Sequence, residues 1–158
     1  MTIPGFVDLQ VNGYMGVDYS SLSLTETDFI ESCKALKNNG TVAFLPTIVT
    51  ASEEIYEQNL AIMCSAMRAN KEVQQMVLGF HIEGPFLSLV DGARGAHPKQ
   101  YIQKPNLPFL KKLINWSEGN IKLLTIASEL EGAKEVCGFA SEQGITISLG
   151  HQIATYHR

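Results

Sequence analysis

The residue in this 158-residue sequence whose type and setting point most directly to chemistry is Glu83. It follows the segment Val77–Ile82, which is too apolar to lie on a protein surface. A carboxylate in such surroundings costs free energy unless it pairs with a cation, binds a metal ion or caps a turn. The position is therefore interpreted as a metal ligand, with a buried ion pair or an N-cap as the alternatives.

Two histidines bear on that interpretation. His151 follows another apolar segment, Ile145–Leu149, and hard oxygen together with imidazole suits Zn²⁺ or a similar ion. His81 stands two residues before Glu83 and so faces the same side of a strand. His81 is a possible near-site partner of the ligands, or a core histidine whose hydrogen bonds are satisfied.

Polar residues also follow the other apolar segments of the chain. Reactive groups in parallel α/β folds sit just past the carboxyl ends of the strands, so these residues are expected at one edge of the sheet. An ordinary solvent-exposed edge would explain one or two polar residues but not a set at every strand end. The set comprises Asp8, Gln10 and Asn12, then Thr47, then Ser128 and Glu129.

A long segment without helical or strand periodicity runs from Phe86 to Pro105. Loops of that length are unusual inside a compact domain and are often functional. Its polar centre is Arg94–Pro98, where a cation and an imidazole would suit an anionic or polyhydroxylated substrate. An ordinary surface loop is the alternative.

The elements that must position these residues alternate between strand and helix. This alternation predicts a parallel sheet with a helix covering each crossover, either an open doubly wound sheet or part of an eight-stranded barrel. No Walker or dinucleotide-binding glycine pattern is present. Strands are expected over 3–11, 41–46, 76–82, 121–127 and 145–149, the first of them buried. Helices are expected over 25–39, from an opening with Thr50 and Glu53 through Met67, from Pro108 through Ile114, and over 131–143.

Composition excludes several classes of protein. With 45% apolar and 18% charged residues the chain is expected to be globular, and a net charge of -4 gives no electrostatic footprint for nucleic acid. No apolar run approaches the ~20 residues of a membrane span, and no secretory signal is recognisable. Three widely spaced cysteines predict reduced thiols and a cytoplasmic location.

Five segments, taken together and in order, resemble the N-acetylglucosamine-6-phosphate deacetylases of the amidohydrolase superfamily. The His-x-Glu-Gly-Pro motif is the most diagnostic of them. The segments are Pro4–Gly13, Phe44–Thr47, His81–Phe86, Arg94–His97 and Ser148–His151.

The resemblance implies a partial (β/α)₈ TIM barrel of the metal-dependent amidohydrolase type, with about five βα units. It implies hydrolysis of N-acetylglucosamine 6-phosphate to glucosamine 6-phosphate and acetate. Glu83 and His151 match metal ligands, and Ala96 and His97 match a substrate-contacting pair. One divalent metal ion per site is implied, either Zn²⁺ or one of Fe²⁺, Mn²⁺ and Co²⁺, and a homodimer is implied for the full-length enzyme.

The chain departs from the superfamily that it resembles at the ends of three strands. Gln10 and Asn12 stand where many members carry His-x-His, which resembles the single-metal branch with Gln10 near the site but not a strong ligand. Ser128 stands where the family usually has proline, and Gln152 where it usually has serine or threonine. Both changes are expected to alter packing or hydrogen bonding at the rim of the site.

The family's catalytic aspartate and second histidine ligand are expected beyond Arg158, and His157 lacks the surrounding motif. A closed barrel needs ~250 residues. Residues 1–158 are therefore interpreted as an incomplete catalytic TIM-barrel domain, with the small N-terminal β domain and the last barrel strands absent, and no turnover is expected from this chain alone. The alternatives are a non-catalytic truncated paralogue that binds a sugar phosphate or a partner chain, a two-metal cyclic amidohydrolase, and a flavodoxin-like domain.

Overall fold

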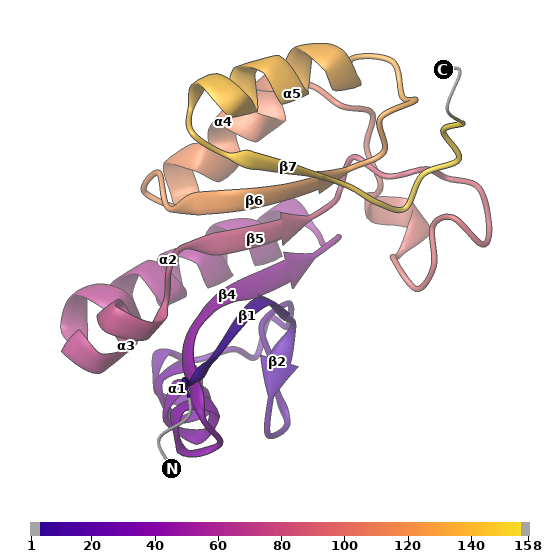
Figure 1. Ribbon diagram of the computed structural model, residues 1–158. Helices are drawn as coiled ribbons and strands as arrows, with labels where there is room; N and C mark the ends of the chain where they lie inside the picture. The colour runs from indigo at the N-terminus through magenta and orange to yellow at the C-terminus, as the bar shows by residue number, and fades with distance from the viewer. Residues whose placement is uncertain (1–3, 156–158) are drawn as a thin grey trace.

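The architecture is a curled parallel sheet with its helices along one side, in a computed structural model that describes residues 4–155 (Figure 1). The order of the strands in the sheet is the order of the strands in the chain. An open doubly wound sheet reverses its strand order at a switch point, so this sequential order corresponds to the barrel alternative. The strands are β1 (Phe6–Val11), β4 (Thr41–Val49), β5 (Phe80–Glu83), β6 (Ile121–Ile126) and β7 (Thr146–Leu149).

The first two long helices lie close to their expected positions. Helix α1 (Glu26–Asn38) begins after Thr25, whose side chain accepts a hydrogen bond from the Asp28 amide at 3.1 Å, as the capping pattern predicted. Helix α2 (Glu53–Ala69) is capped by Ser52 rather than opened by Thr50. The start predicted at Thr50 was too early because the Ser52 hydroxyl accepts the hydrogen bond from the first turn.

The third predicted strand was wrong over its first half. A short helix α3 (Lys71–Met76) extends to its first residue, Met76, and begins where the Asn70 side chain accepts from two amides of the first turn. Val77 makes a single bridge to Phe44, and β5 proper begins only at Phe80. A small hairpin of β2 (Gly13–Tyr14) and β3 (Val17–Asp18) was also not predicted.

The remaining two helices lie together on one side of the second half of the sheet (Figure 1). Helix α4 (Leu107–Trp116) is capped by Asn106, and helix α5 (Ala133–Glu142) starts later than the predicted Glu131. The delay has a backbone cause, since Gly132 takes a φ of 86° and so cannot be a helical residue. Between β5 and α4 the chain is irregular, as predicted, apart from the 3₁₀ turn η1 (Lys99–Tyr101).

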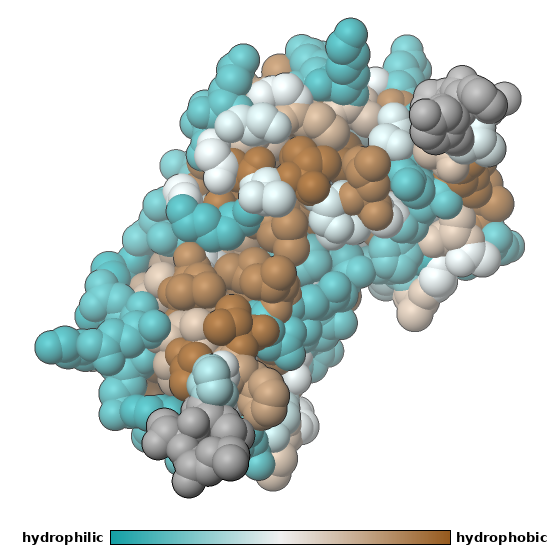
Figure 2. Space-filling view, viewed as in Figure 1, coloured by the Kyte–Doolittle hydropathy of each residue, from teal (hydrophilic) through white to brown (hydrophobic). Residues whose placement is uncertain are grey.

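The hydrophobic core lies between the sheet and the helices, and the opposite, inner face of the sheet is open. β1 was expected to be buried, yet Phe6, Val7 and Leu9 are 64%, 57% and 56% exposed and only Val11 is buried. β1 pairs only with β4 among the described residues, so little covers its far side. Figure 2 shows hydrophobic side chains gathered over this part of the molecule.

Ile3, where the first strand was expected to begin, and His157 lie outside residues 4–155. Within those residues no helix combines the length and the apolar composition needed to cross a membrane.

Candidate functional site

The carboxyl ends of the strands surround a cavity of about 240 Å³. Six of the predicted site residues line it. His81 does not line it and lies deeper in the sheet. Val49 does line it, although no sequence motif indicated this residue. The lining consists of Gln10, Asn12, Val49, Glu83, Ala96, His97, Pro98 and His151.

Glu83 is the last residue of β5 and is only 8% exposed. Its Oε2 accepts a hydrogen bond of 2.9 Å from the side-chain amide of Gln10, which comes from β1 on the far side of β4. Its Oε1 lies 3.0 Å from Nε2 of His151. No lysine or arginine among residues 4–155 forms an ion pair with this carboxylate.

The hydrogen bonds around His151 determine which of its nitrogens carries a lone pair. Nδ1 lies 3.1 Å from the carbonyl oxygen of Ala93, and a carbonyl only accepts, so Nδ1 carries the hydrogen. In the neutral ring, Nε2 then presents its lone pair to Oε1 of Glu83. Two acceptors at 3.0 Å need a proton or a cation between them. Fixing the far nitrogen on a carbonyl is also how proteins orient metal-binding histidines.

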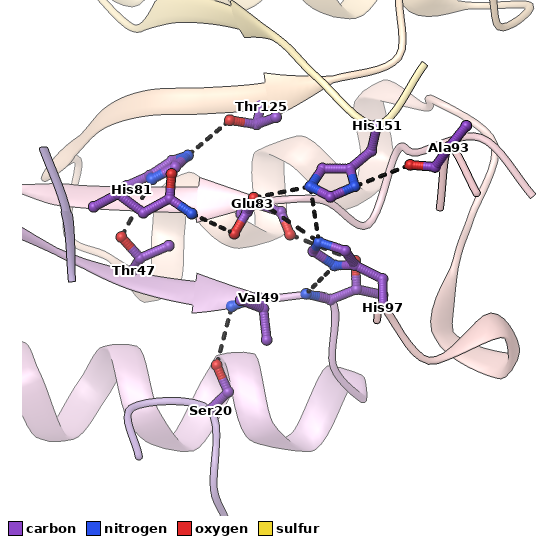
Figure 3. Close-up of polar contacts among 11 residues, drawn as sticks. Ser20, Thr47, Val49, His81, Glu83, Ala93, His97, Thr125 and His151 are labelled. Atoms are coloured by element: carbon purple, nitrogen blue, oxygen red, sulfur yellow. Dashed lines mark hydrogen bonds and ion pairs between the residues drawn. The ribbon is translucent and has the colours of Figure 1, made fainter. Parts of the chain in front are cut away.

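His97 completes the cluster from the loop after β5. Its Nδ1 lies 2.9 Å from the Thr50 hydroxyl, and its Nε2 lies 3.3 Å from Nε2 of His151 and 3.9 Å from Oε1 of Glu83. Burial, reinforced by the neighbouring His151, lowers the pKa of His97 and so favours its neutral form. Figure 3 shows the two imidazoles and the carboxylate turned toward one another.

One donor atom from each of Glu83, His97 and His151 lies within 4.8 Å of the other two. A carboxylate oxygen and imidazole nitrogens at such separations form a donor set that fits Zn²⁺ or a similar divalent ion. The sequence motifs matched two of these residues to metal ligands and His97 to a substrate contact. Nothing in the local sequence around His97 indicates that its ring lies against His151.

The long loop also contains Arg94, which does not line the cavity. Its guanidinium donates to the carbonyl oxygen of His97 at 2.7 Å and pairs with Asp91 at 2.8 Å. Arg94, the cation that was expected to contact a substrate, therefore stabilises the loop that carries Ala96 and His97. Gly84, directly after Glu83, has a φ of 97° and packs against Thr50, a position that leaves no room for a side chain.

His81 is hydrogen-bonded at both ring nitrogens and touches neither cavity nor ligands. Nδ1 lies 3.2 Å from the Thr47 hydroxyl and Nε2 lies 2.7 Å from the Thr125 hydroxyl, so the imidazole joins β4, β5 and β6. Burial lowers the pKa of His81 to about 4, against the opposing charge of Glu83. The ring is thus neutral at pH 7.

Ser128 and Gln152, the two residues that differ from the family pattern after β6 and β7, contact each other. The amide and the hydroxyl of Ser128 lie 3.2 Å and 2.8 Å from the side-chain oxygen of Gln152. Their separation in the chain, 24 residues, gives no sign of this contact. The remaining strand-end residues, Asp8, Thr47 and Glu129, do not line the cavity.

No family model matches this sequence. Relatives are nevertheless similar over almost all of it. The N-acetylglucosamine-6-phosphate deacetylase of Caenorhabditis elegans is 35% identical over 158 residues, covering 96% of this chain and 37% of the relative. The enzyme of the same name from Haemophilus influenzae is 36% identical over 152 residues, covering 96% and 38%.

Solved structures agree with the sequence relatives. A crystal structure of N-acetyl-D-glucosamine-6-phosphate deacetylase from Mycobacterium smegmatis matches with a TM-score of 0.86 and 26% identity, over 98% of this chain and 39% of that one. The deacetylase from Pasteurella multocida matches with a TM-score of 0.82 and 31% identity. The chain thus spans 37% of the length of the curated relative from C. elegans. The resemblance to N-acetylglucosamine-6-phosphate deacetylases is therefore confirmed over 96% of this chain, together with the curled parallel sheet that it implied.

Proposed function

We propose that residues 1–158 form the first five strands of the catalytic barrel of an N-acetylglucosamine-6-phosphate deacetylase, a metal-dependent amidohydrolase. The proposed reaction is hydrolysis of the acetamide of N-acetylglucosamine 6-phosphate to glucosamine 6-phosphate and acetate. The observation that carries the proposal is the cluster of the buried Glu83 and His97 with the partly buried His151 at the carboxyl end of a barrel-type sheet. Catalytic residues of such barrels are carried at that end.

The proposed metal ligands are Oε1 of Glu83 and Nε2 of His151, which face each other without an intervening donor. They would hold one divalent ion, Zn²⁺ or one of Fe²⁺, Mn²⁺ and Co²⁺. When bound, such an ion polarises the amide carbonyl and lowers the pKa of a coordinated water. Gln10 contributes by occupying Oε2 of Glu83, which leaves Oε1 directed at the histidines.

The proposed substrate contacts are Ala96 and His97. The neutral imidazole of His97 has one N–H and one lone pair, so it can either donate to or accept from a polar group of the sugar. A structure of the M. smegmatis enzyme is described as a complex with N-acetyl-D-glucosamine-6-phosphate, which supports an amino-sugar phosphate as ligand. The cavity lining described above contains no lysine or arginine, so the phosphate is proposed to bind groups outside it.

We also propose that the 158-residue chain alone does not turn over substrate. Glu83 is the one carboxylate in the cavity lining, and it is assigned to the metal. The aspartate that the resemblance implies as general acid/base is therefore not among the residues that line the cavity. A homodimer for the longer protein and a cytoplasmic location complete the proposal; the second is supported by three free cysteines.

Metal titration tests the ligand assignment. In the 158-residue chain, Glu83→Gln and His151→Ala should each weaken Co²⁺ binding at least tenfold, because each removes one of two direct ligands. Glu54→Gln, a change of the same type at an exposed position of α2, is the control and should leave the affinity unchanged. Unchanged binding in both cavity variants would refute the metal site.

A non-catalytic protein is the second candidate, favoured by the exposed apolar side chains of Phe6, Val7 and Leu9 on the sheet. Such a protein would bind a sugar phosphate or a partner chain without a metal. Calorimetry with N-acetylglucosamine 6-phosphate in EDTA separates the two. Affinity that is the same with and without metal would support the second candidate and contradict the first.

A further inference from the structure

The turns that follow β6 and β7 are joined by a set of hydrogen bonds outside the cavity. Gln152 accepts from both the amide and the hydroxyl of Ser128, at 3.2 Å and 2.8 Å. The next residue, Ile153, donates its amide to Oε1 of Glu129 at 2.9 Å. None of these four residues lines the cavity, so a direct contact with a ligand there does not explain the arrangement.

The residue directly before this junction is His151, which has a φ of +52°. This left-handed conformation is unfavourable for a residue with a side chain, and it persists only where the surroundings hold it. Upstream, the Gly150 amide donates to the carbonyl of Ile126 at 3.3 Å. A Cβ at Gly150 would lie 2.8 Å from a methyl carbon of Thr125, so the approach of β7 to β6 is close at this point.

The backbone of His151 is also held at its own carbonyl, which accepts from the Ser88 amide at 3.0 Å. The chain is therefore held before, at and after His151, and the hold after it comes from Ser128 and Glu129. The backbone conformation sets the direction of the Cα–Cβ bond of His151, and the hydrogen bond from Nδ1 to the Ala93 carbonyl then orients the ring. Without the Gln152 contact, the hydrogen bond between Ile153 and Glu129 is the one described contact downstream of His151 that would still oppose its return to negative φ.

We propose that Ser128 and Gln152 act as a pair of positioning residues that hold His151 in its left-handed conformation and so direct its Nε2 at Glu83. The effect on metal binding rests on the proposed function, whereas the effect on the conformation of His151 does not. The pair acts through His151 and contacts neither metal nor substrate. Groups of this kind, which orient a direct ligand, change metal affinity by about 10–100-fold when removed.

The first test measures Co²⁺ affinity in the 158-residue chain. Gln152→Leu, which removes the acceptor but keeps the size, should weaken binding about tenfold. Gln152→Glu keeps an acceptor oxygen in place and should restore affinity to within about threefold. In a double-mutant cycle, Ser128→Ala should add little to Gln152→Leu because both remove the same contact. Gln75→Leu, on the exposed side of α3, is the matched control.

The second test needs no metal. NMR in EDTA reports the backbone of His151 through its Cα and Cβ shifts and its HN–Hα coupling, and reports the ring tautomer through the imidazole ¹⁵N shifts. We expect the wild-type signals to show left-handed backbone and Nδ1–H, and the Gln152→Leu signals to shift toward negative φ. Gln152→Glu should keep the wild-type pattern.

The outcomes separate this inference from the proposed function. A wild-type chain that binds no Co²⁺ refutes the metal site, and the NMR comparison then still decides whether the pair holds His151. If Gln152→Leu leaves the His151 signals as in the wild type, the positioning role is refuted, whatever the metal affinity. If the signals move while Co²⁺ affinity stays unchanged, the pair holds the backbone but does not direct a ligand, which also overturns the proposal.

Discussion

Acidification should destabilise this protein through the buried histidine His81, and the network around that ring explains why. The Thr47 hydroxyl donates to the carbonyl of Leu45 at 3.2 Å, so its oxygen accepts from Nδ1–H of His81. Nε2 then accepts from the Thr125 hydroxyl at 2.7 Å. A second ring proton would face the hydroxyl hydrogen of Thr125, in a site with almost no access to water.

The magnitude follows from the pKa in the two states. Burial lowers the pKa of His81 from the ordinary 6.5 to about 4 in the folded protein. The folded-state pKa is the lower one, so between these values the unfolded chain binds a proton that the native protein does not. The stability contributed by neutral His81 is complete above pH 6.5 and is lost as the pH falls toward 4. At pH 5 the loss relative to pH 7 amounts to about 2 kcal/mol.

Urea unfolding at pH 7 and pH 5, in EDTA, measures this quantity in the wild type and in His81→Gln. The glutamine amide keeps a polar group beside the threonines but does not titrate. All other groups contribute to both proteins, so the wild type should lose about 2 kcal/mol more than the variant over this interval. Equal losses in the two proteins, with circular dichroism showing both folded, would refute the argument that His81 is held neutral.

Two substitutions and one labelling experiment have further expected outcomes. Thr25→Ala removes the N-cap of α1 and should lower the free energy of unfolding by about 1 kcal/mol in urea; an unchanged midpoint would show that the cap contributes nothing. Ellman's reagent followed by mass spectrometry should find Cys137, which is half-buried, modified before Cys33 and Cys64. Burial raises the pKa of those two thiols to about 12 and about 11, and equal rates for all three would contradict this ordering. Gly84→Ala places a side chain at a φ of 97° beside Glu83, and should lower both the midpoint of thermal unfolding and Co²⁺ affinity; full retention of both would show that the turn tolerates a side chain.

Elements whose signals are contained within a few residues were predicted well. The cap of α1 depends on Thr25 and Asp28, three positions apart, and its buried stripe repeats with helical period. Helix α3 was missed because six residues are too few to show a period, and its cap at Asn70 stands inside a polar stretch. Alternation predicted parallel strands but left their order in the sheet open between two architectures. The exposure of β1 was not predicted either, since it depends on what lies beyond the sheet edge.

The sequence by itself determined which residue types stand at the ends of the strands: a carboxylate after one apolar segment, an imidazole after another, and an amide on the first. These are properties of short stretches, because strand formation and burial of a segment depend on its own apolar residues. Only the tertiary structure decided which of these groups meet. Glu83 and His151 are 68 positions apart and lie 3.0 Å from each other because parallel pairing brings β5, β6 and β7 into register. The contacts of His97 with His151 and of Ser128 with Gln152 depend on loop paths, which no local pattern encodes.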